Sequence, residues 1–393
     1  MISLTSRKLS VLLFLIASFM QSGFYWFLTI LISRKFGIEA LGSFSYALAI
    51  VSPLTILGSL QLKSYFLTKG EGEIKGQIKW LRFSFLTGLL TISSSVIAFI
   101  EPWLLPVFIL LCLLKWGELW SELSQMIWQS ESGLRIVNRS LFIRYALLFT
   151  GLAIVWSMDF DIIKTLSLVA LISLGIAGVD YFLSPLKRIA FKVRESGTVF
   201  ITTLSLSASS LLTALLVNIP RYQLKEIKSL EDLGMFSILF YYYVIPAMVI
   251  NYACQGLLKD FRGVRKNRNF FLKITGGLAA LSLIFFLFLF FLGESFTLLL
   301  YNKQPEWDLT IVLLITLAFF LGGTASVLHY SLMGAGIYDI QLKTNIISCA
   351  VTLVTGFFTI PSLGVTGAFI SFISGIMIQA FVYAFLFKRL KYE

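Results

Sequence analysis

The stretch Leu41-Gly42-Ser43-Phe44-Ser45 reappears 192 residues later as Leu233-Gly234-Met235-Phe236-Ser237, in a chain of 393 residues. Each copy opens a long apolar segment that also contains a proline, Pro53 in the first copy and Pro246 in the second. The offset is close to half the chain, which indicates two like halves. Membrane proteins of two like halves usually bind their substrate where the halves meet. The repeat therefore predicts a transporter, with Pro53 and Pro246 as equivalent bend points.

The composition excludes an ordinary soluble domain, because 58% of the residues are hydrophobic and only 13% are charged, against about 25% charged in soluble domains. A helix needs about 20 apolar residues to cross a hydrocarbon core. Such runs lie near 10–32, 41–67, 80–100, 103–127, 141–158, 164–184, 198–220, 233–258, 273–300, 309–333, 343–360 and 365–387. Backbone polar groups in lipid must pair within their own segment, and period-2 alternation is absent. The sequence predicts an all-α polytopic membrane protein of about twelve transmembrane helices.

Basic residues indicate how the chain is oriented in the membrane. With the N-terminus in the cytoplasm, seven of the 32 Lys and Arg lie outside, Lys115 lies inside a helix, and the other 24 lie on inward loops or inner helix ends. This is the pattern of the positive-inside rule, and it predicts cytoplasmic N- and C-termini. The net charge of +12 then reflects orientation and attraction to anionic lipid, and argues against nucleic-acid binding.

Other features limit the classes of protein. The first apolar segment is too long for a signal peptide and lacks a cleavage site, so a retained helix is expected. Cys112, Cys254 and Cys349 sit far apart within predicted spans, which predicts packing roles and neither a disulfide nor a metal site. The connections are short, so neither a soluble catalytic domain nor a cofactor is expected.

The basic loop 185–197 divides the chain into two predicted six-helix bundles, 1–190 and 191–393. The first helix of each half carries polar residues at helical spacing: Ser18, Ser22, Tyr25 and Thr29, and then Thr202, Ser205, Ser209 and Thr213. Each set shares one helix face. Two explanations stay open, namely close helix packing through hydroxyl residues and a face that lines a wet cavity between the halves.

The second helix of each half differs in charge. Lys63 lies toward the cytoplasmic end of the first copy, and its equivalent at the same offset is Gln255, on a face shared with Asn251 and Lys259. The sequence therefore predicts a cation in one half where the other half has an amide.

Charged residues within the spans are concentrated in the first half: Lys115, Glu118, Glu122, Arg144 and Asp180. A charge at the bilayer centre costs ~3 kcal/mol on insertion scales, so such residues usually face a cavity and pair. One interpretation is a structural cluster in which Lys115 pairs with Glu118 three residues on. The other is that Lys115 and Arg144 bind an anionic substrate, while the acids couple transport to a proton or sodium ion or hold the cation in place.

Several stretches resemble bacterial polysaccharide flippases, the O-antigen and capsule repeat-unit exporters of the multidrug/oligosaccharidyl-lipid/polysaccharide (MOP) superfamily. The stretch 34–69, with Phe36-Gly37, the first repeat copy and Leu60-Gln61-Leu62-Lys63, is similar to the region between their first and second helices. Asn218-Ile219-Pro220-Arg221-Tyr222, followed by the second repeat copy, is similar to the region between helices seven and eight. The turn Gly364-Val365-Thr366-Gly367-Ala368 before the last helix also fits.

The resemblance implies two six-helix bundles that form a V around a central cavity, open alternately to each side. It also implies that a basic residue at the position of Lys63, with Lys115, holds the diphosphate of a polyprenyl-linked oligosaccharide. Pro220 is expected to end the seventh helix at the outer face, where water reaches Arg221. Arg221 then either guides the diphosphate out of the cavity or pairs with an acid of its own loop, at position 226, 231 or 232.

The expected function is a non-enzymatic flippase that moves an undecaprenyl-diphosphate oligosaccharide to the outer leaflet of the bacterial inner membrane. The expected partners are this substrate, membrane lipids and the polysaccharide polymerase machinery. The alternatives are a multidrug or peptidoglycan-precursor exporter of the same superfamily and, from another class, a membrane glycosyltransferase or polymerase. Such an enzyme typically needs a large outer loop, and every outer loop here is short.

Overall fold

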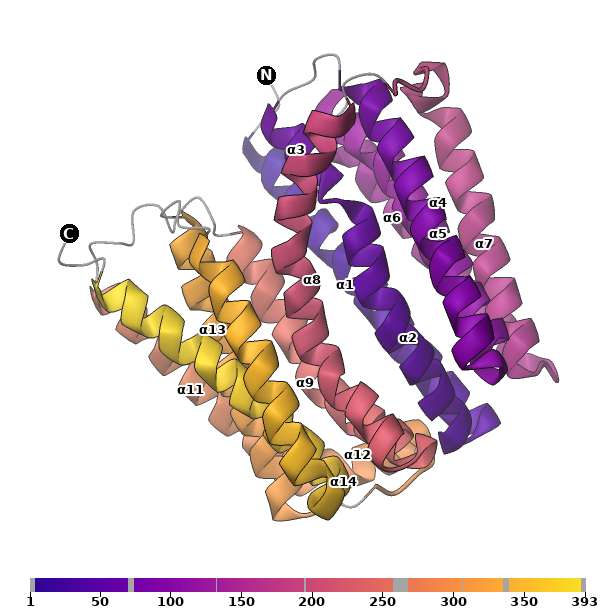
Figure 1. The fold of residues 1–393 in the computed structure, drawn as a ribbon. Coiled ribbons are helices and arrows are strands. Elements are labelled where there is room, and N and C mark those ends of the chain that lie inside the picture. Colours follow the sequence, from indigo (N-terminus) through magenta and orange to yellow (C-terminus); the bar gives the residue numbers. More distant parts are fainter. Residues whose placement is uncertain are drawn as a thin grey trace. The chain divides into compact units, whose positions relative to one another are not determined.

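The computed structural model describes residues 4–69, 74–131, 133–193, 196–256, 268–305, 307–334 and 339–389. Figure 1 shows a ribbon made of helices, and no strand occurs within these ranges. The α-helices of the first half are α1 Leu4–Phe36, α2 Ile38–Ser59, α3 Leu62–Lys69, α4 Lys75–Ile100, α5 Leu105–Glu131, α6 Leu134–Ser157 and α7 Ile162–Leu183. Those of the second half are α8 Ser196–Ile227, α9 Leu230–Gly256, α11 Arg268–Phe288, α12 Glu294–Tyr301, α13 Leu309–Gly334 and α14 Asp339–Arg389.

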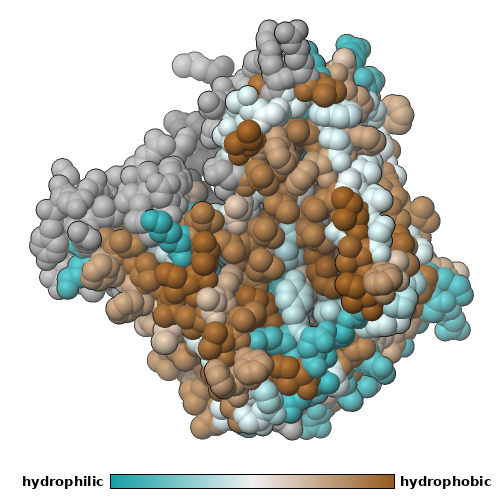
Figure 2. All heavy atoms as spheres, viewed as in Figure 1, coloured by the Kyte–Doolittle hydropathy of each residue, from teal (hydrophilic) through white to brown (hydrophobic). Residues whose placement is uncertain are grey.

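Ten helices of the described chain are long and apolar enough to cross a membrane. The last of them, α14, contains 51 residues and loses helical geometry at Gly364 (φ 55°, ψ −123°), so it holds the last two predicted apolar segments. The first predicted segment lies within the 33-residue helix α1. Hydrophobic residues cover most of the face in Figure 2, as expected for helices in contact with lipid. The prediction of an all-α polytopic membrane protein is confirmed.

The chain forms two compact units. The first unit contains Met1–Leu31 and Ala47–Ala214, and the second contains Ile32–Tyr46 and Leu215–Glu393. The connection between α1 and α2 therefore packs with the second unit, although it belongs to the first half of the sequence. The predicted boundary between residues 190 and 191 stays a prediction.

The second predicted span is interrupted between α2 and α3. Helix α2 continues through Pro53, and α9 continues through Pro246, so neither proline ends its helix. The break comes instead at Leu60 and Gln61, which both have left-handed backbone angles (φ 49° and 47°). Such angles are costly for residues other than glycine. Burial of the Leu60 side chain and a 3.1 Å hydrogen bond from Gln61 Nε2 to Ser210 Oγ on α8 stabilise this conformation.

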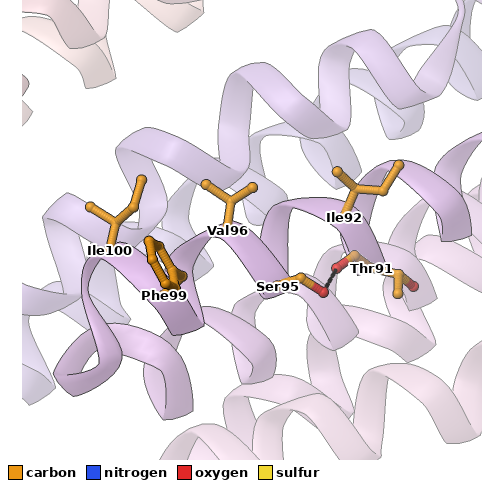
Figure 3. Close-up of a pocket in the computed structure, with 6 residues that line it drawn as sticks. All are labelled: Thr91, Ile92, Ser95, Val96, Phe99 and Ile100. Carbon is orange, nitrogen blue, oxygen red and sulfur yellow. Dashed lines mark hydrogen bonds between the residues drawn. The ribbon is translucent and has the colours of Figure 1, made fainter.

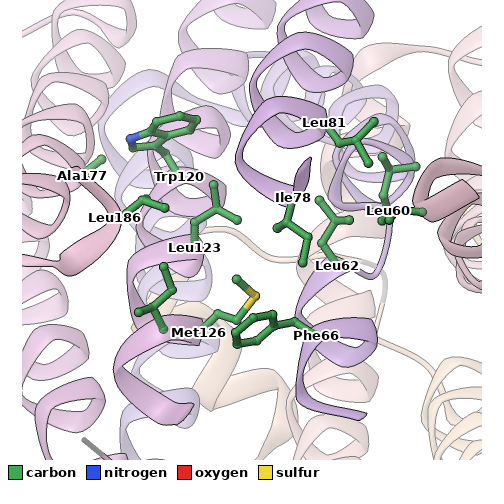
Figure 4. Packing of buried hydrophobic residues seen from close by; sticks show 12 residues of the cluster. Leu60, Leu62, Phe66, Ile78, Leu81, Trp120, Leu123, Met126, Ala177 and Leu186 are labelled. Atoms are coloured by element: carbon green, nitrogen blue, oxygen red, sulfur yellow. The ribbon is translucent and has the colours of Figure 1, made fainter. Parts of the chain in front are cut away.

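An apolar cluster in the first unit fixes α3 beside α5. Leu62 and Phe66 of α3 are buried with Leu123 and Met126 of α5 (Figure 4). Burial of such side chains stabilises a fold by about 1.5–3 kcal/mol each in water, whereas within a membrane the gain comes mainly from close packing. This cluster positions α3, whose second residue is Lys63, next to the C-terminal half of α5.

Candidate functional site

Lys115, Glu118 and Tyr25 form a compact charged cluster between α5 and α1. Lys115 Nζ lies 2.9 Å from Glu118 Oε2 and 3.9 Å from the centroid of the Tyr25 ring. The Tyr25 hydroxyl donates a 2.8 Å hydrogen bond to Glu118 Oε1. The side chains of Lys115 and Glu118 are 17% and 8% exposed. The i, i+3 pair predicted from the sequence is therefore formed, and Tyr25 completes it through both its ring and its hydroxyl group.

Arg144 and Asp180 belong to a second buried network, centred on Ser121 of α5. Arg144 Nη2 donates to Ser121 Oγ and to the Gly117 carbonyl oxygen at 3.3 Å. The Asp180 carboxylate accepts 3.0 Å hydrogen bonds from Ser140 Oγ and interacts with Ser121 and with the charge of Arg144. This arrangement joins α5, α6 and α7 and leaves Arg144 only 2% exposed.

Helix α4 contributes two buried cations, Lys79 and Arg82, which are among the 24 basic residues that the sequence analysis assigned to inward loops or inner helix ends. Arg82 Nη2 lies 3.0 Å from Glu122 Oε2, with the Arg82 side chain 1% exposed. Lys79 Nζ donates to the carbonyl oxygens of Leu186 (3.1 Å) and Ile189 (2.8 Å). The sequence did contain a pattern that predicts the burial of Arg82, because Arg82 falls at i+4 spacing between Ile78, Leu86 and Leu90, which form the buried face of α4.

Lys63 lies on α3, whereas Lys115 lies on α5. Lys63 is half-buried near the start of α3, and α3 packs on the part of α5 around Leu123 and Met126. Those residues follow Lys115 by 8 to 11 positions, which is roughly 12 Å or more along the helix axis at about 1.5 Å per residue. The helix α3 therefore packs on the part of α5 that follows Lys115, and a shared role of the two predicted cations in substrate binding stays a prediction.

Arg221 lies within the second unit, inside α8. This helix continues through Pro220 to Ile227, so the prediction that Pro220 ends the helix is wrong. Membrane helices tolerate an interior proline when neighbouring groups satisfy the freed backbone carbonyl, and Leu216, Ile219 and Leu224 around Pro220 are all buried.

Arg221 is also less accessible than predicted, because its side chain is buried. Its Nη1 donates to Asn218 Oδ1 at 2.9 Å, and its guanidinium carbon lies 5.2 Å from the centroid of the Phe240 ring. Two of the three expected acid partners are engaged elsewhere: Glu226 pairs with Lys225 at 2.9 Å, and Asp232 accepts from Ser229 Oγ at 2.6 Å. Among the described residues Arg221 forms no ion pair with any of the three acids. The predicted pairing is therefore wrong, and an amide and an aromatic ring hold the guanidinium instead.

The polar residues that were predicted to share helix faces differ in burial. Ser22 and Thr29 are buried, and the Thr29 hydroxyl donates to the Trp26 carbonyl oxygen at 2.6 Å. Ser209 and Asn251 are half-buried. The side chains of Ser18, Ser205 and Gln255, and residue Lys259, lie outside the described part of the structure. The bond of Thr29 to its own helix is consistent with the close-packing explanation for that position.

A hollow on the outside of α4 is a poor candidate for the substrate path. Its lining residues are Thr91, Ile92, Ser95, Val96, Phe99 and Ile100, all from one helix (Figure 3). Most of these side chains are exposed, and the Ser95 hydroxyl is already bonded to the Thr91 carbonyl oxygen at 3.1 Å. An apolar, uncharged helix face of this kind is what contact with lipid tails requires.

Known proteins resemble this chain in sequence and in fold. The capsular polysaccharide biosynthesis protein CapF of Staphylococcus aureus is 24% identical over 386 residues, covering 93% of this chain and 95% of CapF. The lipid II flippase MurJ in an inward closed conformation has a TM-score of 0.67 at 15% identity, over 96% of this chain and 87% of that one. No protein-family model matches.

A third similar structure is an inward-facing multidrug resistance MATE family transporter of the MOP superfamily, with a TM-score of 0.68 at 13% identity, over 96% of this chain and 99% of that one. The chain has the fold of the MOP superfamily. The superfamily resemblance predicted from the repeat and the Pro-Arg-Tyr segment is therefore confirmed.

Lys115 in the first unit and Arg221 in the second unit are held by different kinds of partner. The described cations on α4 and α5 of the first unit are each bound by a carboxylate or by main-chain carbonyl oxygens. Arg221 of the second unit has only neutral partners in the described part of the chain. Buried charges within membrane segments usually mark functional or tightly paired positions, and Lys115 and Arg221 are the clearest representatives of these two environments.

Proposed function

We propose that the protein is a flippase that moves an undecaprenyl-diphosphate-linked oligosaccharide from the cytoplasmic to the outer leaflet by alternating access. The similarity to CapF over 93% of the chain, together with the MOP-superfamily fold, carries this proposal. An oligosaccharide on a lipid has a polar headgroup that needs a protein path and a tail that stays in lipid. The chain itself would make and break no covalent bond.

Lys63 is proposed as the first contact of the diphosphate. It lies near the start of α3, beyond the 22 residues of α2, a helix about 33 Å long at 1.5 Å per residue and hence long enough to cross the hydrocarbon core. In the proposed orientation Lys63 would lie near the cytoplasmic interface, where a charge stays hydrated at low cost. An anion arriving from the cytoplasm meets such a lysine before it meets any cation deeper in the helices.

Lys115 is proposed as the second, deeper cation. Its ammonium group is partly exposed and already paired with Glu118, so a diphosphate has to compete with that carboxylate. Glu118 is accordingly the best-placed of the predicted coupling acids, because a proton or sodium ion bound there would weaken its hold on Lys115. Arg144, Glu122 and Asp180 are assigned structural roles, since their described contacts join helices of the first unit.

The proposed location is the bacterial inner membrane, with both termini in the cytoplasm as the distribution of Lys and Arg indicates. The proposed partners are the lipid-linked oligosaccharide, the surrounding lipids and the polymerase machinery that consumes the flipped repeat unit.

A peptidoglycan-precursor flippase is the second candidate, and the similarity to the lipid II flippase MurJ favours it. Both substrates are diphosphate lipids, so Lys63 and Lys115 would serve either one. A multidrug exporter is the third candidate, favoured by the similarity to the MATE transporter. Purified protein in liposomes separates the three candidates: we expect accelerated flipping of an undecaprenyl-diphosphate oligosaccharide, and flipping of lipid II alone or uptake of a cationic dye alone would overturn the proposal.

The role of Lys63 is tested in cells that depend on this chain for surface glycan. Lys63→Ala is expected to abolish surface glycan at an unchanged protein level, and Lys63→Arg to retain most of it, because a cation at the interface is what the diphosphate requires. Lys343→Ala, at an exposed lysine of α14, is the matched control and should export normally. Normal export by Lys63→Ala at native expression would contradict the assignment.

A further inference from the structure

The linker between the two predicted halves, described over residues 185–193, is fixed along the beginning of α4. The Lys192 main-chain N–H donates a 3.1 Å hydrogen bond to the Gly76 carbonyl oxygen. The buried Lys79 ammonium donates to two further main-chain oxygens of the linker, at 3.1 and 2.8 Å. All of these residues belong to the first compact unit, so the linker is a held part of that unit and its side chains have defined positions.

Aromatic rings gather where the linker crosses α4. The centroid of the Phe191 ring lies 6.1 Å from that of Trp80 and 5.8 Å from that of Phe83. Lys79 Nζ lies 4.6 Å from the Phe191 centroid, yet the Phe191 side chain is still 47% exposed. Rings that pack on protein with one part and stay exposed with the other suit the boundary between lipid headgroups and acyl chains.

The linker also carries cations that the protein does not neutralise. On the neighbouring helix end the charge of Lys75 is paired with Glu131 at 2.7 Å. Arg188 and Lys192 are exposed, and within the described part of the chain their side chains have neither an ion pair nor a hydrogen bond. Lys187 Nζ donates to a main-chain oxygen at the end of α7 at 2.8 Å, a capping contact that leaves its positive charge in place.

We propose that the linker is a binding site for anionic phospholipids of the bilayer, in which Arg188 and Lys192 bind the headgroup phosphates and Phe191 inserts at the level of the headgroups. Basic side chains at the ends of membrane helices bind anionic headgroups in this way. In the proposed orientation the linker faces the cytoplasmic leaflet, whose surface is negatively charged. The inference does not depend on which substrate the chain transports.

A specific site differs from the general attraction of a basic protein to anionic lipid, because the position of its cations matters. Here Lys79 supplies the position: its ammonium group holds the linker main chain on both sides of Arg188, at residues 186 and 189. The exposed cations and the half-exposed ring of Phe191 are thereby kept together on one short segment.

Lipid titration of the full-length protein in neutral detergent, measured by native mass spectrometry, tests the site. Phosphatidylglycerol is the probe, and phosphatidylcholine is the comparison without net charge. Arg188→Gln with Lys192→Gln is expected to weaken the tightest phosphatidylglycerol binding by about 10- to 30-fold, from roughly 1 kcal/mol for each basic residue near an anionic surface. Phosphatidylcholine binding should stay unchanged.

The matched control is Arg135→Gln with Arg139→Gln on α6. Both arginines are exposed, and within the described part of the chain neither has an ion pair or a ring contact. This variant removes the same amount of charge on the same side of the predicted membrane topology, and its loss of phosphatidylglycerol binding should be clearly smaller. An equal loss in the two variants would show that net charge alone attracts the lipid and would overturn the proposal, as would unchanged binding by the linker variant.

A fluorophore on the linker gives a second measurement in a bilayer with both linker cations intact. Val193 is exposed, and Val193→Cys is labelled in a protein whose three native cysteines are replaced by alanine. In phosphatidylglycerol liposomes, brominated lipids should quench this label and aqueous acrylamide should quench it weakly. Quenching by acrylamide alone would place the linker in water and overturn the proposal. Binding through the linker by a protein that flips no oligosaccharide lipid would still support the site, while removing the proposed function.

Discussion

Replacing Glu118 by glutamine separates a structural from a transport role of the Lys115–Glu118 pair. The amide keeps the shape of the side chain and still accepts the Tyr25 hydroxyl, but it removes the negative charge 2.9 Å from Lys115 Nζ. Leaving a buried ion without its partner costs about 3–5 kcal/mol. The Lys115 side chain is 17% exposed, so its ammonium stays partly solvated, and we expect a smaller loss of about 2–3 kcal/mol.

The control for this loss removes both charges. Lys115→Met with Glu118→Gln retains the volume and the acceptor for Tyr25, and replacing a buried pair by uncharged groups is often neutral. We expect the double variant to lie within about 1 kcal/mol of the parent protein. In a thermal scan in detergent the single variant should unfold about 4–12 °C lower, from a shift of roughly 2–4 °C per kcal/mol, and the double variant should return to near the parent midpoint.

Glycan export then decides the role of the pair. If Lys115 binds the substrate anion, the double variant is stable and exports little. If the pair only joins α1 to α5, export recovers together with stability. A single Glu118→Gln variant that unfolds at the parent temperature would refute the reasoning, because the buried ammonium would then not depend on that carboxylate.

Three further predictions concern other elements. Because Arg221 is buried against Asn218 and an aromatic ring, Arg221→Lys and Arg221→Gln should both lower the amount of protein in membranes with export per molecule unchanged; full export by the lysine variant alone would indicate a charge role. Gly364 has a backbone conformation that favours glycine, so Gly364→Ala should cost about 1–3 kcal/mol of folding free energy and lower the thermal midpoint. An unchanged midpoint would contradict the break assigned in α14. A 2.7 Å bond from the Lys164 backbone N–H caps α7 and holds the pKa of exposed Asp161 below its usual 3.8. The carboxylate thus stabilises the fold above that pH and loses its effect as the pH falls through its lowered pKa. The midpoint difference between the parent protein and Asp161→Ala should therefore be larger at pH 7 than at pH 3, and a difference that grows on acidification would refute this sign.

Local spacing was sufficient to predict the helices and the Lys115–Glu118 pair. Both depend on residues within one turn or one span, so hydropathy and helix geometry determine them. Arg82 and Lys79 belong to the 24 basic residues assigned to inward loops or inner helix ends, because the positive-inside rule predicts on which side of the membrane basic residues gather. The rule does not predict which of these side chains are buried in the protein. Their burial depends on Glu122 and on the main-chain oxygens after α7, which sequence spacing does not bring together.

The break at Leu60 and Gln61 had no such local signal. Glycine or asparagine at these positions would have indicated left-handed backbone, whereas leucine and glutamine favour a continuing helix. A hydrogen bond to Ser210, 149 residues away, stabilises the observed conformation. The prolines likewise did not predict where the backbone bends. Pro53 and Pro246 occupy equivalent positions in the repeat but lie inside continuous helices, because tertiary contacts decide where the backbone departs from a helix.

Gly42 and Gly234, the glycines of the internal repeat, lie directly against the carbonyl oxygens of Leu230 and Ile38, and these two contacts limit how this chain can evolve. A clash between two side chains can be repaired by shortening either one, so a harmful change at one position usually has a compensating change at the other. Here the atom facing each glycine is a main-chain oxygen, which every amino acid carries, and no replacement at residue 38 or 230 removes it. The proposed substrate contacts, Lys63 and Lys115, are side chains and can be exchanged, whereas no change at a second position makes room for a side chain at these two glycines.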